Sequence, residues 1–149
     1  MALHKNFING EWVEGKGIRE NINPSDLTDI VGEYAQADRA QTEAAIAAAK
    51  AAQPTWAATT PQVKADILET IGTELLARKD EIGRLLSREE GKPLSNGIAE
   101  TMRAAQIFKF FAQETLRTEG VAVSSVRPGV DVLITREPLG VVGLICPWN

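Results

Sequence analysis

The sequence predicts an α/β fold with a helical layer, an antiparallel ribbon and the start of a parallel sheet. Residues 38–120 carry apolar side chains at three-to-four spacing, which is typical of helices. Residues 121–136 are rich in β-branched side chains around a central Pro-Gly pair. Residues 141–145 (VVGLI) are an unbroken apolar run, as expected of a strand buried on both faces of a parallel sheet.

The segment before the helices predicts short strands and turns. Residues 7–13 (FINGEWV) predict a hairpin, because the central Asn-Gly pair suits the positive φ angles of a type I′ turn. Residues 22–26 (INPSD) predict a turn, since proline fixes φ and the polar side chains after it can bond nearby amides. Residues 29–35 (DIVGEYA) predict a strand.

Capping signals predict the ends of the first two helices. Asp38, with Gln41 three residues later, is a good N-cap for the first helix. Pro54 is expected to end that helix, because proline has no N–H to donate. The Thr60-Pro61 pair starts the second helix, with proline at the first helical position.

Two more helices follow in the sequence. The third is predicted to open at Asp80 and to close at Gly91, and the fourth runs from Pro93 to near Gly120. Apolar side chains at helical spacing predict one buried face on the second and fourth helices. These side chains are Val63, Ile67, Leu68, Ile71 and Leu75 in the second helix, and Ile98, Met102, Ala105, Phe108 and Ala112 in the fourth. We interpret the whole helical block as scaffold.

The last third of the sequence is rich in strands. Residues 121–126 and 130–136 predict two strands joined by an Arg-Pro-Gly sequence that favours a type II turn. The run 141–145 has two interpretations. Either its parallel neighbours belong to a larger α/β protein, of which these 149 residues are the front part, or it adds an edge to the earlier strands.

Composition and residue inventory exclude several classes of function. A net charge of −4 and a pI near 5.1 argue against a nucleic-acid partner. No apolar run approaches the roughly 18 residues of a membrane span, and no secretory signal is present, so we expect a cytoplasmic protein without a membrane partner. His4 is the only histidine, so the chain cannot complete a Ser-His-Asp, Cys-His or Cys/His zinc site.

The segment ITREPLGVVGLICPWN resembles a motif of the aldehyde dehydrogenase family, R-x-P-x-G-V-V-x-x-I-x-P-W-N. The matching positions are Arg136, Pro138, Gly140, Val141, Val142, Ile145, Pro147, Trp148 and Asn149. Supporting likeness runs through FINGEW, INPSD, AAIAAAKAAQPTWA and REEGKP. The resemblance covers the whole chain but only about the first third of a family member.

The resemblance implies the N-terminal part of the aldehyde dehydrogenase fold. Residues 1–119 correspond to the first part of an NAD(P)-binding domain, residues 120–137 to an oligomerisation ribbon, and residues 138–149 to a return to its Rossmann-like parallel sheet. It also implies a homodimer or homotetramer that oxidises a small aldehyde with NAD or NADP. Within the family the sequence is most similar to enzymes for α-ketoglutaric semialdehyde, and next to those for succinate semialdehyde.

In the family, a cysteine attacks the aldehyde, hydride passes to the nicotinamide, and a glutamate activates the water that hydrolyses the thioester. Both residues lie downstream of the P-W-N motif, so this chain alone is expected to be inactive. Asn149 matches the asparagine whose amide donates to the oxyanion. Ile145, Cys146, Pro147 and Trp148 match the stretch that lines the cofactor cleft, and we do not interpret Cys146 as the nucleophile.

Alternatives exist for the role of Glu89 and for the function of the whole chain. Glu89 matches an acidic position near a monovalent-cation site of some family members, with backbone oxygens from Asn21 and Ile22. We instead interpret Glu89 as part of a solvated helix end and assign no metal ligand. The alternative to an enzyme is a self-standing α+β interaction module. That module would have to match the nine motif positions by chance.

Overall fold

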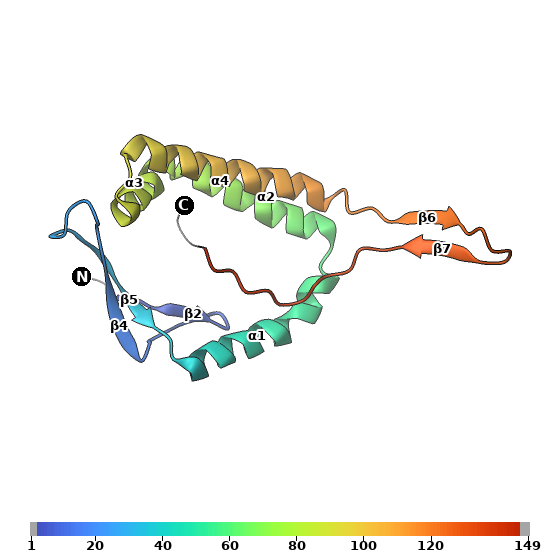
Figure 1. Cartoon of the computed structure of the whole chain (residues 1–149), viewed down its shortest axis with the longest axis horizontal. Coiled ribbons are helices and arrows are strands. Elements are labelled where there is room, and N and C mark those ends of the chain that lie inside the picture. Colours follow the sequence, from blue (N-terminus) through green and yellow to red (C-terminus); the bar gives the residue numbers. More distant parts are fainter. Residues whose placement is uncertain (1–2, 147–149) are drawn as a thin grey trace.

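The computed structural model describes residues 3–146, which fold into small sheets, four helices and a protruding ribbon (Figure 1). The strands before the helices are β1 (Leu3–His4), β2 (Asn6–Ile8), β3 (Glu11–Val13), β4 (Gly17–Ile22) and β5 (Ile30–Gln36). The helices are α1 (Arg39–Ala58), α2 (Pro61–Ala77), α3 (Lys79–Glu90) and α4 (Leu94–Thr115). The ribbon consists of β6 (Val121–Ser124) and β7 (Asp131–Ile134).

The N-terminal strands form two separate sheets. β1, β5 and β4 lie in that order, with β1 parallel and β4 antiparallel to β5. β2 and β3 form the predicted hairpin, and Asn9 (φ 54°) and Gly10 (φ 82°) have the positive angles of a type I′ turn. β4 was not predicted, because Ile18 and Ile22 flank a polar stretch instead of alternating with polar residues.

Most of the predicted helix ends are confirmed. Asp38 Oδ1 accepts a hydrogen bond from the Gln41 backbone N–H at 2.8 Å, and Pro61 lies at the start of α2. Gly91 closes α3 with a left-handed φ of 74°. The prediction that Pro54 ends the first helix is wrong, because α1 continues to Ala58. The missing N–H of Pro54 removes one hydrogen bond in the penultimate turn, and α1 tolerates that loss.

The helices α2, α3 and α4 pack through small residues. Gly83 of α3 and Gly97 of α4 are buried against each other, and a Cβ added at Gly97 would lie 2.3 Å from the Gly83 carbonyl oxygen. Ala65 of α2 and Ala105 of α4 are also buried. The backbones of these helices therefore approach closely, because no larger side chain separates them.

The predicted buried faces of α2 and α4 are only partly correct. Ala105 and Ala112 of the predicted α4 face are buried, but Met102 is 38% exposed. On α2, Val63 and Ile67 are 46% and 41% exposed. The periodicity marks an apolar stripe correctly, but the contacts among these helices involve the adjacent stripe of small residues.

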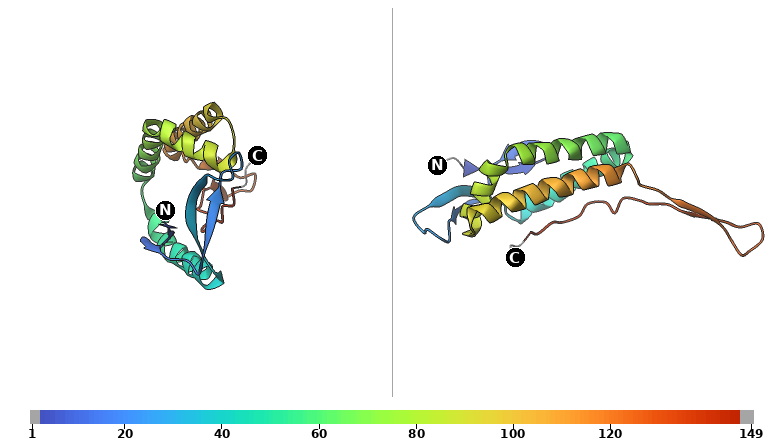
Figure 2. Two further views of the ribbon diagram at one scale, coloured as in Figure 1. Left: turned by 90° about the vertical axis from the view of Figure 1, so that its left-hand side faces the viewer. Right: turned by 90° about the horizontal axis from the view of Figure 1, so that it is seen from above.

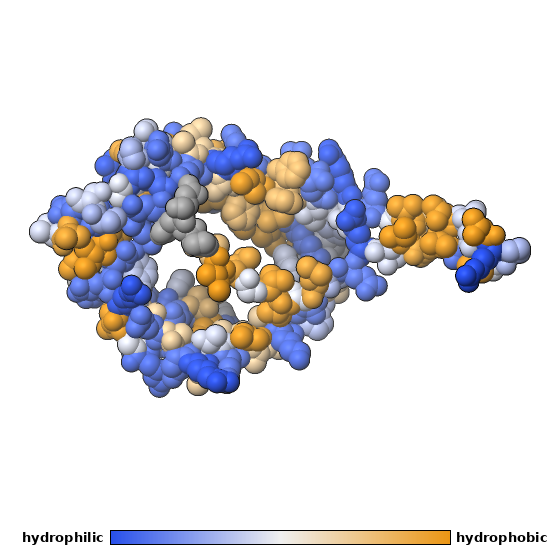
Figure 3. All heavy atoms as spheres, in the orientation of Figure 1, coloured by the Kyte–Doolittle hydropathy of each residue, from blue (hydrophilic) through white to orange (hydrophobic). Residues whose placement is uncertain are grey.

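The helix α1 lies apart from the α2–α4 layer, and no residue of α1 is buried. Residues after β7 run as an extended segment between α1 and that layer (Figures 1 and 2). The space-filling view shows an opening through the middle of the molecule with hydrophobic residues at its border (Figure 3). Residues 3–146 contain no helix that could span a bilayer, judged by its length and hydrophobicity.

Residues 141–145 do not form the predicted strand. They have no regular secondary structure and every one of them is exposed, Ile145 by 95%. They also do not pair with the edge of β1, β4 or β5. A strand needs a hydrogen-bonded neighbour, and none of the strands in residues 3–146 takes that place.

Candidate functional site

The predicted site lies at the C-terminal end of the chain, and the structure describes only part of it. Ile145 and Cys146 end the extended segment and are both exposed. The Cys146 thiol is free and exposed. Pro147, Trp148 and Asn149 lie outside the described residues. The roles of Ile145, Cys146, Pro147, Trp148 and Asn149 in catalysis or cofactor binding stay predictions.

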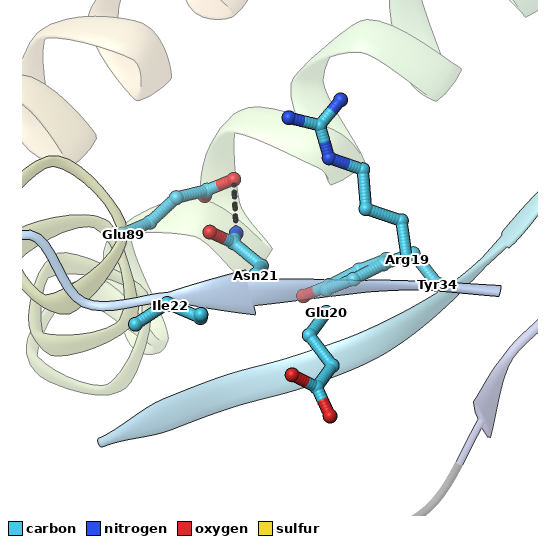
Figure 4. Close-up of a pocket in the computed structure, with 6 residues that line it drawn as sticks. All are labelled: Arg19, Glu20, Asn21, Ile22, Tyr34 and Glu89. Atoms are coloured by element: carbon cyan, nitrogen blue, oxygen red, sulfur yellow. Dashed lines mark hydrogen bonds between the residues drawn. The ribbon is translucent and has the colours of Figure 1, made fainter. Parts of the chain in front are cut away.

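A second candidate site lies where β4 meets the end of α3 (Figure 4). The amide Nδ2 of Asn21 donates a hydrogen bond of 2.9 Å to Glu89 Oε1. Around this pair is a surface hollow of ≈ 590 Å³. Its lining residues are Arg19, Glu20, Asn21, Ile22, Tyr34 and Glu89. The structure thus brings together Asn21, Ile22 and Glu89, which the family resemblance also groups.

Glu89 is not the freely solvated side chain that its sequence context predicts. It is half-buried, and its carboxylate is held by the Asn21 amide. Within residues 3–146, no three acidic, histidine or cysteine side chains lie close enough together to hold a metal ion. The observed role of Glu89 is to join α3 to β4 through a hydrogen bond.

A neighbouring ion pair joins α3 to the residue directly before β5, and we call it the α3 clamp (Asp29 and Arg88). Arg88 donates from Nε to Asp29 Oδ2 at 2.9 Å and from Nη2 to Oδ1 at 2.5 Å. Asn23 Nδ2 donates to Asp29 Oδ2 at 3.1 Å. The hydrogen bonds from Arg88, and then from Asn23, lower the pKa of Asp29 to about 2. No sequence signal indicates this pair, because its members are far apart along the chain.

The comparisons with known proteins bear on the whole chain. Residues 12–149 match the sequence model of the Aldehyde dehydrogenase family. The chain belongs to this family. The resemblance of its C-terminal motif and the expected fold class are therefore confirmed, since solved aldehyde dehydrogenases also share its architecture.

Curated aldehyde dehydrogenases match this chain almost from end to end. It is 35% identical to the alpha-ketoglutarate semialdehyde dehydrogenase of Haloferax volcanii, over 97% of the chain and 30% of that enzyme. It is 36% identical to the alpha-ketoglutaric semialdehyde dehydrogenase of Bacillus subtilis, with the same coverage. The succinate-semialdehyde dehydrogenase [NADP(+)] of Escherichia coli is 33% identical over 96% of the chain. The chain spans 30% of the length of each of these relatives.

Solved aldehyde dehydrogenases share the fold of this chain. Betaine aldehyde dehydrogenase from Staphylococcus aureus, solved in complex with NAD+, has a TM-score of 0.85 and 25% identity. The match covers 91% of this chain and 28% of that one. An NADP-dependent enzyme of E. coli has a TM-score of 0.82 and 30% identity over 87% of this chain. The arrangement of separated sheets, helices and ribbon is thus that of the family.

The α3 clamp predicts how stability depends on pH. The test protein is a chimera in which residues 1–149 replace the matching segment of the B. subtilis enzyme. Because folding lowers the pKa of Asp29 below its usual 3.8, the clamp stabilises fully above that value and loses its effect as the pH falls toward 2. We expect Asp29→Asn to lower stability at pH 7 and to flatten its decline between about pH 5 and pH 2.

The matched control for this prediction is Glu11→Gln, an exposed carboxylate on β3, outside both the clamp and the ribbon. Urea unfolding of the three proteins at several pH values measures the effect. An unchanged slope with pH in the Asp29→Asn chimera would show that the clamp does not form.

Proposed function

We propose that this chain is the N-terminal portion of an NAD(P)-dependent aldehyde dehydrogenase that oxidises a semialdehyde to the carboxylic acid through a thioester. The proposed substrate is α-ketoglutaric semialdehyde, with succinate semialdehyde or another aldehyde as the alternative. The observation that carries the proposal is the family match through residue 149, which includes the complete P-W-N motif. The named relatives that act on semialdehydes support the substrate class.

Asn149 is the proposed oxyanion donor. When the aldehyde carbonyl is attacked, negative charge develops on its oxygen, and an uncharged amide N–H can stabilise it without forming a competing ion pair. Losing one such donor costs on the order of 3 kcal/mol of barrier. The attacking cysteine and the glutamate base are expected, from the family resemblance, in the part of the enzyme beyond the P-W-N motif. We therefore expect residues 1–149 alone to be inactive.

The proposed cofactor cleft includes Ile145, Cys146, Pro147 and Trp148. Ile145 lies in an extended segment outside every strand of residues 3–146, so its backbone N–H and C=O are not committed to a sheet. An extended, exposed segment fits a wall that contacts a dinucleotide partly through backbone atoms. NAD or NADP, when bound, accepts the hydride from the substrate. We also propose a cytoplasmic location.

The ribbon of β6 and β7 is the proposed oligomerisation element. Its four-residue strands are exposed throughout, and each has an outer edge of unpaired backbone groups. Such an edge can pair with a strand of a second subunit. We propose residues 120–137 as this element, with residues 1–119 and 138–149 in the cofactor-binding domain, and a homodimer or homotetramer. A monomeric chimera in size-exclusion chromatography would contradict this assembly.

The substrate proposal predicts a ranking of kcat/KM values in the chimera. We expect α-ketoglutaric semialdehyde to be oxidised at least about tenfold more efficiently than succinate semialdehyde, which corresponds to about 1.4 kcal/mol of transition-state binding. The formation of reduced cofactor measures both rates, with the unaltered B. subtilis enzyme as the reference. A preference for the shorter substrate in the chimera, but not in the reference, would assign succinate semialdehyde instead.

A further inference from the structure

The chain contains two Asn-Gly sequences, and the structure places them in opposite environments. They are Asn9-Gly10 in the turn between β2 and β3, and Asn96-Gly97 at the start of α4. An asparagine before glycine can lose its side-chain amide as ammonia. The backbone nitrogen of the glycine attacks the amide carbon of the asparagine, and glycine has no Cβ to obstruct that approach. The folded environment of each pair then decides whether the attack takes place.

Asn9 and Gly10 form the tip of the β2–β3 hairpin, where the attack is open. The ladder pairs Ile8 with Glu11, and the Gly10 N–H lies outside it. Both turn residues are exposed, and a Cβ built on Gly10 would meet no atom within 4 Å. This free space lets the Asn9 side chain turn toward the backbone nitrogen of Gly10.

Asn96 and Gly97 lie in the first turn of α4, where the attack is blocked. The Gly97 N–H donates a hydrogen bond of 3.3 Å to the Pro93 carbonyl oxygen. Gly97 is also buried, with its Cβ position only 2.3 Å from the Gly83 carbonyl oxygen. The Gly97 nitrogen can react only after this turn opens and separates from α3. Local opening costs free energy, and each cost of about 1.4 kcal/mol lowers the rate about tenfold.

We infer that Asn9 is a site of spontaneous covalent modification, where it converts to aspartate and isoaspartate through a succinimide. The Gly10 nitrogen gives up its proton and forms a bond to Asn9 Cγ, and the side-chain nitrogen takes up that proton and leaves as ammonia. Water then opens the ring. Addition at the side-chain carbonyl gives aspartate, and addition at the main-chain carbonyl of Asn9 gives isoaspartate, whose backbone runs through the former side chain.

The isoaspartate product alters the hairpin that carries it. It adds a methylene group to the backbone of a two-residue turn and places a negative charge at the tip. The register of a hairpin depends on the type and length of its turn. The cross-strand pair of Phe7 and Trp12, whose ring centroids lie 4.9 Å apart, is set by that register. The modification therefore disturbs the β2–β3 pairing and does not depend on the proposed function.

The test follows both asparagines in the chimera during incubation at mildly alkaline pH, where the glycine nitrogen loses its proton more readily. Trypsin releases them in the separate peptides 6–16 and 89–103, and mass spectrometry measures the replacement of each amide by a carboxyl group. In the native chimera we expect Asn9 to convert at least about tenfold faster than Asn96. In urea, where both turns are unfolded, we expect the two rates to agree within about threefold.

Two variants assign the modified residue. Protein isoaspartate methyltransferase, applied to peptide 6–16 from the incubated chimera, reports the isoaspartate product. Asn9→Gly removes the reacting amide and keeps a Gly-Gly pair that suits the same turn, so it is expected to abolish this methylation. The matched control Asn96→Ala is expected to leave the methylation unchanged.

Three outcomes would overturn the inference. The first is equal conversion of Asn9 and Asn96 in the native chimera. The second is conversion of Asn9 in urea but not in the native chimera, which would show that the turn protects it. The third is methylation of peptide 6–16 that persists in Asn9→Gly, which would place the modification at Asn6.

Discussion

Replacing Asn149 with alanine in the chimera is expected to lower the rate of acylation by two or more orders of magnitude. In its proposed role, Asn149 supplies a neutral N–H donor to the oxygen where negative charge develops, and losing such a donor costs on the order of 3 kcal/mol in the transition state. Because that charge is absent from the bound aldehyde, the dissociation constant of the substrate should change little. Single-turnover measurement of reduced cofactor formation gives both quantities.

The matched control for this prediction is Asn96→Ala, an exposed asparagine in the first turn of α4. It removes the same amide from a position distant in sequence from the motif. Acylation by Asn149→Ala within about threefold of the unsubstituted chimera would contradict the oxyanion role. A large rise in the substrate dissociation constant with unchanged acylation would instead indicate a binding role.

The second large effect is expected on stability. Gly97→Ala in the chimera should lower the free energy of unfolding by about 1–3 kcal/mol, the usual cost of overpacking. In an open helix position the same change would stabilise by up to about 1 kcal/mol, because alanine favours helix. Here the new methyl would lie 2.3 Å from the Gly83 carbonyl oxygen, a backbone atom that cannot rotate away. The α3 and α4 helices would have to separate.

Gly17→Ala is the matched control for this prediction. A Cβ at Gly17 would make only an ordinary contact, 3.6 Å from the Gln36 side chain. Urea unfolding of the chimera with each substitution compares the two. An increase in stability with Gly97→Ala would show that α3 and α4 are further apart than the structure has them.

Local signals in the sequence predicted most of the elements correctly. The Asn9-Gly10 hairpin, the Asp38 cap and the left-handed Gly91 each depend on a few neighbouring residues. The positive φ of 70° at Gly129 also agrees with the type II turn expected in the ribbon. Such features are predictable because their physical causes lie within a few residues of each other.

Burial and strand pairing depend on residues far apart along the chain, so the local sequence could not predict them. The burial predicted for the apolar stripe of Val63, Ile67 and Ile71 is wrong for the described residues, because no element within residues 3–146 covers these side chains. The strand expected at 141–145 likewise has no hydrogen-bonded neighbour among the described strands. In both places the apolar sequence pattern predicts burial, and no element within residues 3–146 provides the covering contact.

The candidate sites also combine features that the sequence predicts with contacts that only the structure reveals. The sequence motif supplied the residues at the C-terminal end, and the likeness to a family supplied their roles. Geometry added the Asn21–Glu89 hydrogen bond and the Asp29–Arg88 clamp, which join elements far apart along the chain. No spacing rule relates these positions, so only the folded arrangement reveals that they meet.

We propose that residues 1–149 supply the N-terminal part of a working aldehyde dehydrogenase. The formation of reduced cofactor by the chimera with α-ketoglutaric semialdehyde tests this proposal. We expect kcat/KM within about tenfold of the unaltered B. subtilis enzyme, a change of about 1.4 kcal/mol or less. A chimera that unfolds cooperatively and binds NAD or NADP, yet oxidises no aldehyde, would contradict the claim.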